Sequence, residues 1–379
     1  MAKDIVVIKS MGDALRNTGY KNLESAVSEI VDNSIQANAK DTFIIISESV
    51  DSQTGRKCVT DFAFLDNGDG MNLEELGACL GIGYTTRSDR KGMGRFGVGL
   101  PQASLHVTPT VDVYSWQNGY ENCHKVFLDI GKVKSGEQTE IADPEPNNIP
   151  EEYQQYLSYK TLMDEYDFKV HGTLVHWKNC DRVSPKSIHK VIERLDFALG
   201  QKFRHLIKDG KQRIQLFNQT NDAFIKEILP NDPLFLMNNN YVLGDPEKPG
   251  EIVRSPHNKN HVPLFEPFVD ETCEEGAKIV PVKYIYTDSH MKKSVKESSV
   301  TVRFSKIKNI FYDKTAISSN PGSTPMGQYT AKMEGISIVR ANREIDFGMF
   351  DFYKNINEPQ HRWWVIVLPN FSIHEMVFS

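Results

Sequence analysis

The sequence places an acid and an amide one helical turn apart, at Glu29 and Asn33. Both lie in a segment whose small or apolar residues recur with a helical period, namely Leu23, Ala26, Val27, Ile30, Val31 and Ser34. This pattern predicts a helix with one apolar stripe, with Glu29 and Asn33 on one flank of the stripe and Asp32 on the opposite side. A carboxylate suits general-base chemistry and an amide oxygen suits a hard cation. The alternative is a solvated amphipathic helix.

A second candidate site follows a predicted strand, residues 59–65, which runs into Asp66. Gly68 and Gly70 allow the backbone to turn sharply and to approach a ligand closely. Asp66, at the end of a buried strand, can accept a hydrogen bond from a ligand amine. A calcium-binding loop is excluded, because both glycines fall where an EF-hand needs oxygen-bearing side chains and Gly77 replaces its final glutamate.

A third candidate, residues 81–100, is dense in glycine and carries more basic than acidic residues. Every second or third residue between Gly92 and Gly99 is glycine, and a helix is predicted to start at Leu100. Free backbone N–H groups and the positive end of a helix dipole both favour anions. The stretch therefore predicts a phosphate-binding segment.

Other nucleotide-binding motifs fit less well. The glycine spacing also occurs in dinucleotide-binding motifs, but those directly follow a strand, whereas residues 85–91 are polar and charged. The P-loop signature is absent. The kinase-like triplet Asp346-Phe347-Gly348 is not preceded by a kinase catalytic loop.

Taken in order, the E-x-x-x-N helix, the D-x-G-x-G turn, the glycine-rich segment and a Gly172-Thr173 strand resemble the GHKL ATPases. That superfamily holds gyrase, the ninety-kilodalton heat-shock chaperone, sensor histidine kinases and MutL. The sequences of residues 28–34 and 94–100 are most similar to the microrchidia (MORC) proteins and their bacterial relatives. The resemblance implies an α+β fold: a Bergerat-type two-layer α/β sandwich that binds ATP, followed by a transducer-like α/β domain.

The resemblance also implies roles for these residues. Glu29 would be the general base, and Asn33 would be the protein ligand of one Mg²⁺ beside ATP. Asp66 would accept from the adenine amino group, supported through water by Thr173. The other nucleotide contacts would come from the two glycine-rich segments, at Gly68, Gly70, Met71, Lys91, Gly92, Gly94, Arg95, Phe96, Gly97, Val98, Gly99 and Leu100.

Several strands must hold these segments in place. Apolar runs predict strands at residues 43–47, 111–116, 124–130, 172–177 and 213–217. A helix is predicted at 186–200, and residues 136–167 are expected to be a surface excursion that is partly helical. We expect an ATP-binding domain at residues 1–220 and a transducer-like domain at residues 221–379, incomplete at its C-terminus if the chain is a fragment.

The second half alternates β-rich runs with loops, and residues 336–345 resemble a microrchidia transducer strand. Between residues 278 and 314, nine lysines and arginines face three acids. This basic face is either a solvated surface or a patch that faces DNA.

Two features depart from the family pattern. Gln36 stands where relatives usually carry Asp, which we interpret as a structural difference. In relatives a transducer lysine reaches the γ-phosphate, but residues 365–379 contain no lysine. Either the chain is a fragment or another residue takes this role, with Lys332, Arg340 and Arg343 as candidates.

Composition limits the classes of protein. The chain has 379 residues, 39% of them hydrophobic and 25% charged, as in soluble proteins of two domains. A net charge of -6 argues against a strongly basic nucleic-acid binder as a whole. The five cysteines lack C-x-x-C spacing and are expected to be free thiols. No membrane span or signal peptide is predicted, so a cytoplasmic location without a membrane partner is expected.

The leading hypothesis is a slow, Mg²⁺-dependent ATPase that acts as a nucleotide-gated homodimerisation switch or clamp. In its preferred form it is MORC-like and associates with DNA, in defence or repair. One alternative is a chaperone-like protein remodeller, although the chain lacks the long client-binding regions expected of one. The other is a nucleotide-sensing regulator that binds ATP without hydrolysing it.

Overall fold

A computed structural model describes residues 16–17, 19–81, 98–161, 164–220, 225–237, 242–253, 261–271, 273, 275–287, 291–312, 321–349 and 364–368. The chain divides into two compact units. One is drawn from residues 1–196 and 211–228, and the other from residues 197–210 and 229–379. Each unit has its own sheet and its own apolar core.

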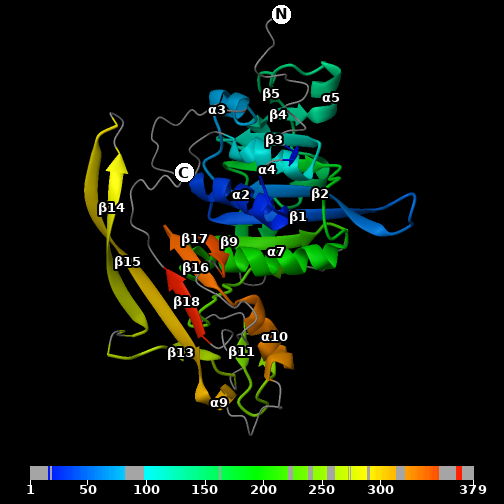
Figure 1. The fold of residues 1–379 in the computed structure, drawn as a ribbon. Helices are drawn as coiled ribbons and strands as arrows, with labels where there is room; N and C mark the ends of the chain where they lie inside the picture. Colours follow the sequence, from blue (N-terminus) through cyan, green and yellow to red (C-terminus); the bar gives the residue numbers. More distant parts are fainter. Residues whose placement is uncertain are drawn as a thin grey trace, which may run out of the picture. The chain divides into compact units, whose positions relative to one another are not determined.

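The first unit is built on an eight-stranded sheet with the order β10-β9-β1-β2-β8-β3-β4-β5 (Figure 1). Its strands are β1 (Asp41–Val50), β2 (Lys57–Asp66), β3 (Thr110–Trp116), β4 (His124–Asp129), β5 (Glu145–Pro146), β8 (Gly172–Lys178), β9 (Arg213–Asn218) and β10 (Ile225–Glu227). Neighbouring strands are antiparallel, except that β1 and β9 run parallel. The strands predicted in this half are confirmed, as is the mixed α/β fold.

Helix α2 (Leu23–Gln36) holds both Glu29 and Asn33. It begins at a capping box, in which Asn22 Oδ1 accepts from the Ser25 backbone N–H at 2.9 Å and Ser25 Oγ accepts from the Asn22 N–H at 3.3 Å. The predicted apolar stripe is buried. Asp32, expected on the opposite side, is buried as well, so α2 contacts protein around more of its circumference than one stripe.

A layer of helices covers the sheet face that carries the site. Helix α4 (Gly99–Val107) packs against α2, and Ser104 Oγ of α4 accepts from Trp177 Nε1 of β8 at 2.8 Å. Helix α7 (Ile188–Lys202) lies beside α2, where Arg194 pairs with Glu24 at 3.8 Å. The shorter elements are α3 (Leu73–Ala78), η1 (Tyr120–Asn122) and α5 (Ile130–Ser135).

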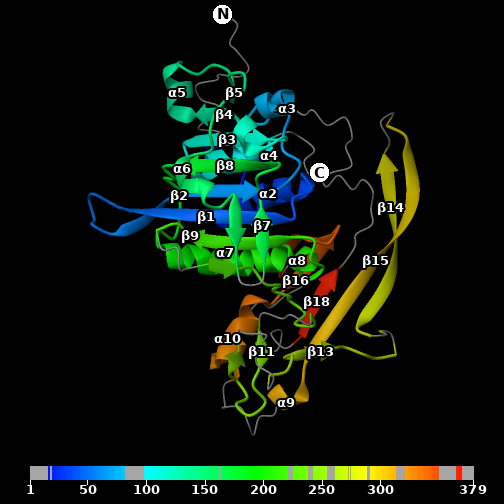
Figure 2. The ribbon, with the colours of Figure 1, turned by 180° about the vertical axis from the view of Figure 1, so that it is seen from behind.

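Residues 136–167 cover the other face of the sheet, which the sequence analysis did not anticipate (Figure 2). This segment contains α6 (Glu151–Gln154), β6 (Ser158–Lys160) and β7 (Glu165–Asp167). Tyr153, Tyr156 and Tyr166 pack with Phe43 and Phe217 of the sheet. The prediction of a surface excursion relied on prolines and acids, whereas the aromatic residues between them form a core.

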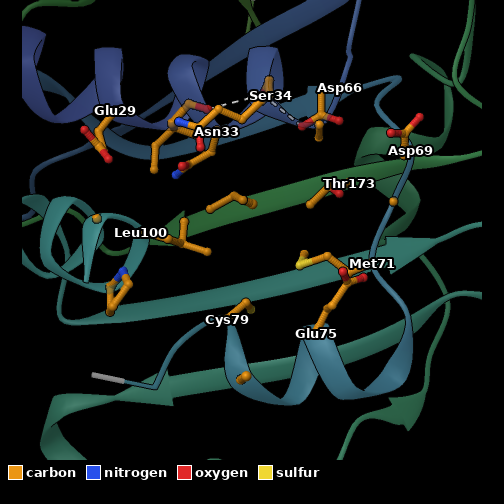
Figure 3. Close-up of a pocket in the computed structure, with 18 of the residues that line it drawn as sticks. Glu29, Asn33, Ser34, Asp66, Asp69, Met71, Glu75, Cys79, Leu100 and Thr173 are labelled. Carbon is orange, nitrogen blue, oxygen red and sulfur yellow. Dashed lines mark hydrogen bonds between the residues drawn. The ribbon is translucent and has the colours of Figure 1, made fainter. Parts of the chain in front are cut away.

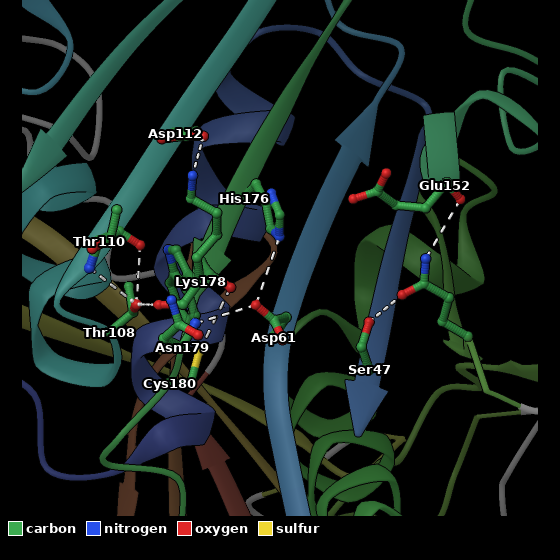
Figure 4. A network of polar contacts seen from close by, with 12 residues as sticks. Ser47, Asp61, Thr108, Thr110, Asp112, Glu152, His176, Lys178, Asn179 and Cys180 are labelled. Carbon is green, nitrogen blue, oxygen red and sulfur yellow. Dashed lines mark hydrogen bonds and ion pairs between the residues drawn. The ribbon is translucent and has the colours of Figure 1, made fainter. Parts of the chain in front are cut away.

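A polar network next to these aromatic residues includes Asp61, Asp112, His176 and Lys178 (Figure 4). His176 Nε2 of β8 lies 3.0 Å from the Tyr153 hydroxyl and 3.9 Å from Asp61 Oδ1. Burial lowers the pKa of His176 to about 4, so its ring is neutral at pH 7. Asp112 Oδ2 is neutralised by Lys178 at 2.7 Å and Lys125 at 2.9 Å.

The second unit contains a six-stranded sheet in which β13, β15, β18, β16 and β17 follow in that order and β14 pairs with β15. Its elements are α8 (Arg204–Lys208), β11 (Leu243–Gly244), β12 (Ile252–Val253), β13 (Phe265–Pro267), β14 (Ala277–Thr287), β15 (Lys293–Ile307), α9 (Asn309–Tyr312), η2 (Pro321–Ser323), α10 (Pro325–Lys332), β16 (Ile336–Arg340), β17 (Arg343–Gly348) and β18 (Trp364–Leu368). The predicted transducer-like strand is thus a β16–β17 hairpin, turned by Ala341 and Asn342 with φ values of 50° and 63°.

A fully buried arginine joins α8 to this hairpin. Arg204 donates to Glu344 Oε2 of β17 and to Ser337 Oγ of β16, both at 2.8 Å, and to the Gln201 carbonyl at 2.8 Å. Burial raises the pKa of Glu344, although Arg204 opposes that shift. Removing one partner of such a buried pair is strongly destabilising, by about 3–5 kcal/mol, because it leaves an uncompensated charge.

All five cysteines are free thiols, as expected. Among the residues that the structure describes, no helix is long and apolar enough to cross a membrane.

Candidate nucleotide-binding site

A cavity of about 380 Å³ opens between α2, α3, α4 and the sheet of the first unit (Figure 3). The residues that line it include members of the Glu29 helix, the turn after Asp66, the end of the glycine-rich segment and the Thr173 strand. They are Glu29, Ile30, Asn33, Ser34, Gln36, Ala37, Asp66, Asp69, Gly70, Met71, Glu75, Ala78, Cys79, Gly99, Leu100, Pro101, Gln117, Thr173 and Val175.

Glu29 and Asn33 both face the cavity from α2, one turn apart (Figure 3). The Asn33 side-chain amide nitrogen is buried and has no hydrogen-bond partner among the described residues. A buried amide without a partner costs about 1–3 kcal/mol, so such a group in a native protein calls for a ligand or water. Asn33 is therefore available to bind something in the cavity.

Asp66 ends β2 at the wall of the cavity, and both of its carboxylate oxygens are held. Ser34 Oγ donates to Oδ2 at 2.8 Å, and the Gly68 backbone N–H donates to Oδ1 at 2.9 Å. Burial raises the pKa of Asp66 to about 6, although both hydrogen bonds oppose this shift. At pH 7 Asp66 is thus an ionised acceptor, fixed in orientation, in a poorly hydrated place.

The turn after Asp66 is locked on both sides. Asn67 Oδ1 accepts from the Lys40 and Asp41 backbone N–H groups at 3.0 and 2.9 Å. Gly70 has φ of +68°, and a Cβ there would lie 2.2 Å from the Trp116 carbonyl oxygen. Only glycine fits at this position. His171 Nδ1 lies 2.6 Å from the Gly68 carbonyl oxygen, so the residue just before β8 contacts the turn.

Strand pairing sets three polar residues in a row beneath the cavity. Asp66 of β2 is opposite Thr173 of β8, and Thr173 is opposite Ser115 of β3. Opposite residues in antiparallel strands point to the same face. Ser115 Oγ lies 3.2 Å from Thr173 Oγ1 and accepts from the Met71 backbone N–H at 2.8 Å. The sequence analysis missed Ser115, because its role depends on strand register.

Helix α3 forms a wall that the sequence analysis also missed. Glu75 and Cys79 face the cavity from it (Figure 3). Burial raises the pKa of the Cys79 thiol to about 12, so it is a neutral, apolar lining group at pH 7. The only signal in the sequence was a helical spacing, with Glu75, Ala78 and Cys79 on one face.

Gly99 opens α4 directly against Glu29. A Cβ at Gly99 would lie 2.2 Å from Glu29 Oε1, so the glycine makes room for the carboxylate. Leu100 also lines the cavity, whereas Val98 caps α4 without a side-chain hydrogen bond. The remaining residues of the predicted phosphate-binding segment lie outside the described part of the chain; they are Lys91, Gly92, Gly94, Arg95, Phe96 and Gly97.

Three comparisons relate the chain to known proteins. Residues 20–173 match the family model of "Histidine kinase-, DNA gyrase B-, and HSP90-like ATPase". The chain is 26% identical over 99 residues to Protein MICRORCHIDIA 6 of Arabidopsis thaliana, a match that covers 26% of this chain and 14% of that protein. A solved structure, described as the crystal structure of the N-terminal domain of a DNA repair protein, aligns over 95% of this chain and 86% of that chain, with a TM-score of 0.49 and 15% identity.

The matched residues run from the start of α2 to Thr173, and they include the helix, the turn after Asp66 and the strand that together enclose the cavity. Residues 20–173 are therefore similar to the histidine kinase-, DNA gyrase B- and HSP90-like ATPases, the GHKL group, and part of the chain is similar to a microrchidia protein.

Proposed function

We propose that the first unit binds ATP with Mg²⁺ in this cavity and hydrolyses it to ADP and phosphate. The observation behind the proposal is that Glu29 and Asn33 of α2 and Asp66 of β2 line one cavity. The second unit takes the transducer-like role. The boundary predicted near residue 220 belongs to this proposal.

The base would lie at the Asp66 end. The ionised, immobilised carboxylate accepts from an exocyclic amine, and the sharp turn at Gly70 brings the backbone and Met71 against the ring. Thr173 stands beside Asp66 in the row that strand pairing creates. This arrangement favours adenine among the common bases.

The triphosphate would lie at the Asn33 end. The first backbone N–H groups of α4 have no side-chain cap, and uncapped N–H groups at a helix start favour anions. The predicted segment from Lys91 to Gly97 precedes this helix and would complete the cradle.

Asn33 would offer its amide oxygen to magnesium, while its buried Nδ2, which has no partner among the described residues, would donate to a phosphate oxygen or to water. Mg²⁺ takes one or two protein ligands and otherwise binds water and phosphate oxygens, where it neutralises charge. Among the described residues no group of three or more His, Cys, Asp or Glu side chains is arranged around a metal. A site built on one amide needs no such group.

Glu29 would take a proton from the attacking water. Its carboxylate lies one turn from Asn33 and against Gly99 at the start of α4, where the absence of a side chain leaves room for it. General-base catalysis of this kind contributes about 10²–10⁴-fold to the rate. We therefore expect Glu29→Gln to keep ATP affinity within about threefold and to lower phosphate release by about 10²-fold or more.

The control for that experiment is Glu24→Gln, which changes an acid on the same helix outside the cavity-lining set. Phosphate release at the wild-type rate from the Glu29 variant would remove Glu29 from the proposed role. Loss of binding as well as hydrolysis would mean that Glu29 holds the nucleotide and is not the base.

Nucleotide-gated homodimerisation is the form of action that we favour, because it would couple an ATP site to a second, transducer-like unit. A chaperone-like remodeller and a non-hydrolysing sensor remain the competing hypotheses. Lys332, at the end of α10, and Arg340 and Arg343, beside the β16–β17 turn, stay candidates for the γ-phosphate contact. A molar mass that doubles only with a non-hydrolysable ATP analogue, measured by light scattering, would support the switch.

DNA association is the second part of the proposal, and its basis is the hairpin of β14 and β15, a long two-stranded ribbon (yellow in Figure 1). Its described residues carry one acid, Glu297, and seven exposed basic side chains: Lys278, Lys283, Lys292, Lys293, Lys296, Arg303 and Lys306. Lysines and arginines in this density attract a polyanion.

Two features of the ribbon disfavour a further strand or a second copy as its partner. β14 pairs only with β15 among the described strands, and Pro281 in its middle lacks an N–H group, which discourages addition of a further strand. Face-to-face packing of two copies would bring like charges together. A two-stranded ribbon does fit the major groove of duplex DNA, which is about 12 Å wide, whereas the major groove of duplex RNA is narrow and deep.

A salt titration tests this part separately from ATP chemistry. Replacing Lys292, Lys293 and Lys296 together with glutamine should lower affinity for duplex DNA and reduce the slope of log K against log salt by up to about 3. The control replaces Lys132, Lys134 and Lys160, three exposed lysines of the first unit. An unchanged slope, or equal binding of duplex RNA, would contradict the assignment of this ribbon to DNA.

A further inference from the structure

Ser115, at the end of β3, lies where three segments of the nucleotide site meet. It is buried, and its hydroxyl oxygen contacts three groups. It accepts from the Met71 backbone N–H at 2.8 Å, donates to the Gly172 carbonyl oxygen at 3.1 Å, and lies 3.2 Å from Thr173 Oγ1. One hydroxyl group thus joins the turn after Gly70 to the start of β8.

The single proton of Ser115 decides how the neighbouring threonine is oriented. We assign the Ser115 proton to the Gly172 carbonyl oxygen, because that oxygen can only accept whereas the Thr173 hydroxyl can be the donor in its contact with Ser115. The two lone pairs of Ser115 then accept from Met71 N–H and from the Thr173 hydroxyl. The hydroxyl proton of Thr173 is then directed at Ser115, so the Thr173 hydroxyl offers only lone pairs to the cavity.

The consequence is a cavity floor made of acceptors. Asp66 is ionised and receives its hydrogen bonds from Ser34 and Gly68, so it offers no donor. Thr173, directly opposite it in the strand pairing, offers none while Ser115 holds its proton. Both residues line the cavity, and Ser115 lies behind them.

We propose that Ser115 is a specificity-determining positioning residue, which makes this floor accept a 6-amino purine and reject a 6-oxo purine. The inference rests on the proposed ATP site. A 6-amino group donates to the acceptor row. A 6-oxo group brings a third acceptor against the same row; the adjacent N1–H can pair with one acceptor of the row but leaves the 6-oxo oxygen without a donor, and an unpaired buried acceptor is costly. Ser115 acts through Thr173 and Met71, so it need not touch the base.

The proposal separates two effects of Ser115→Ala. Loss of the acceptor for the Met71 N–H loosens the turn, which weakens every purine nucleotide alike. Release of the Thr173 hydroxyl allows its proton to turn into the cavity and to donate to a 6-oxo group. The second effect is specific, because it favours one base over the other.

Inosine triphosphate is the matched probe, because it differs from ATP at the 6-position and in the protonation of the adjacent ring nitrogen. Affinities for ATP and inosine triphosphate would be measured by calorimetry on the full chain. We expect the wild-type protein to prefer ATP, and we expect Ser115→Ala to reduce that preference about tenfold, the value of one ordinary hydrogen bond. Ser28→Ala is the control, because its buried hydroxyl donates to Glu24 on α2.

A double variant tests the mechanism. Thr173→Val removes the hydroxyl that would be released, so Ser115→Ala combined with Thr173→Val should reject inosine triphosphate as the wild type does. Thermal melts by circular dichroism confirm that each variant is folded.

Three results would overturn the inference. The first is an equal loss of affinity for both nucleotides in Ser115→Ala, as a merely structural role predicts. The second is a double variant that tolerates inosine triphosphate. The third is a wild-type protein that binds neither nucleotide, which would contradict the proposed function itself and is thus distinguishable from the other two.

Discussion

Gly99→Ala tests whether the Glu29 carboxylate must stay where the structure has it. The new Cβ would lie 2.2 Å from Glu29 Oε1. Ordinary contacts between carbon and oxygen begin near about 3.3 Å, so the carboxylate must move by about 1 Å. The displaced atom ends a flexible side chain, and Gly99 starts a helix, so the free energy of unfolding should change little.

A displacement of about 1 Å at a catalytic group can cost about 10²-fold in rate. We therefore expect Gly99→Ala to lower phosphate release by about two orders of magnitude while ATP affinity, measured by calorimetry, changes less than about threefold. The methyl group removes no backbone N–H, which is why binding should persist.

The matched control is Gly77→Ala on α3, where a Cβ would lie 3.5 Å from Pro144 Cδ and 3.7 Å from Pro144 Cγ, both ordinary contacts. Combining Gly99→Ala with Glu29→Gln should slow hydrolysis no further than Glu29→Gln alone, because both act on one carboxylate. Wild-type hydrolysis by Gly99→Ala, or additive losses in the double variant, would refute the idea that this glycine positions the base.

Two further predictions concern metal binding and pH. Asn33→Ala should remove the dependence of ATP affinity on Mg²⁺, measured by calorimetry with and without the cation; an unchanged dependence would refute the magnesium assignment. Burial lowers the pKa of His176 to about 4, below the usual 6.5. Between these pH values the unfolded chain binds more protons than the folded chain, so the free energy of unfolding decreases as the pH is lowered through that window. We therefore expect the free energy of unfolding, measured with urea, to be about 2 kcal/mol lower at pH 5 than at pH 7 because of His176, and we expect His176→Gln to lack this contribution. Equal losses in both proteins would contradict the prediction.

Local rules predicted the elements that hold the site. The apolar period of α2 and its Asn22 cap are local patterns that can be seen within one short stretch of sequence, and the strand before Asp66 is a largely apolar run. Glu29 and Asn33 therefore appear on one flank from periodicity alone. The same rule failed for Asp32, because burial depends on what packs around a helix as well as on its own pattern.

Contacts between distant segments could not be predicted in this way. Ser115 acquires its role from the pairing of β3 with β8, which no local pattern reports. The contact of Gly99 with Glu29 depends on how α4 docks against α2. Likewise, the sequence of residues 136–167 indicates a polar surface segment, whereas in the structure its aromatic side chains pack against the second face of the sheet.

The central claim is that Glu29, Asn33 and Asp66 surround one bound molecule of ATP. A crystal structure of the chain with a non-hydrolysable ATP analogue and Mg²⁺ tests it most directly. We predict the adenine amino group beside Asp66 and the triphosphate between Asn33 and the start of α4. Nucleotide bound anywhere else on the protein, or none bound at saturating concentration, would contradict the account.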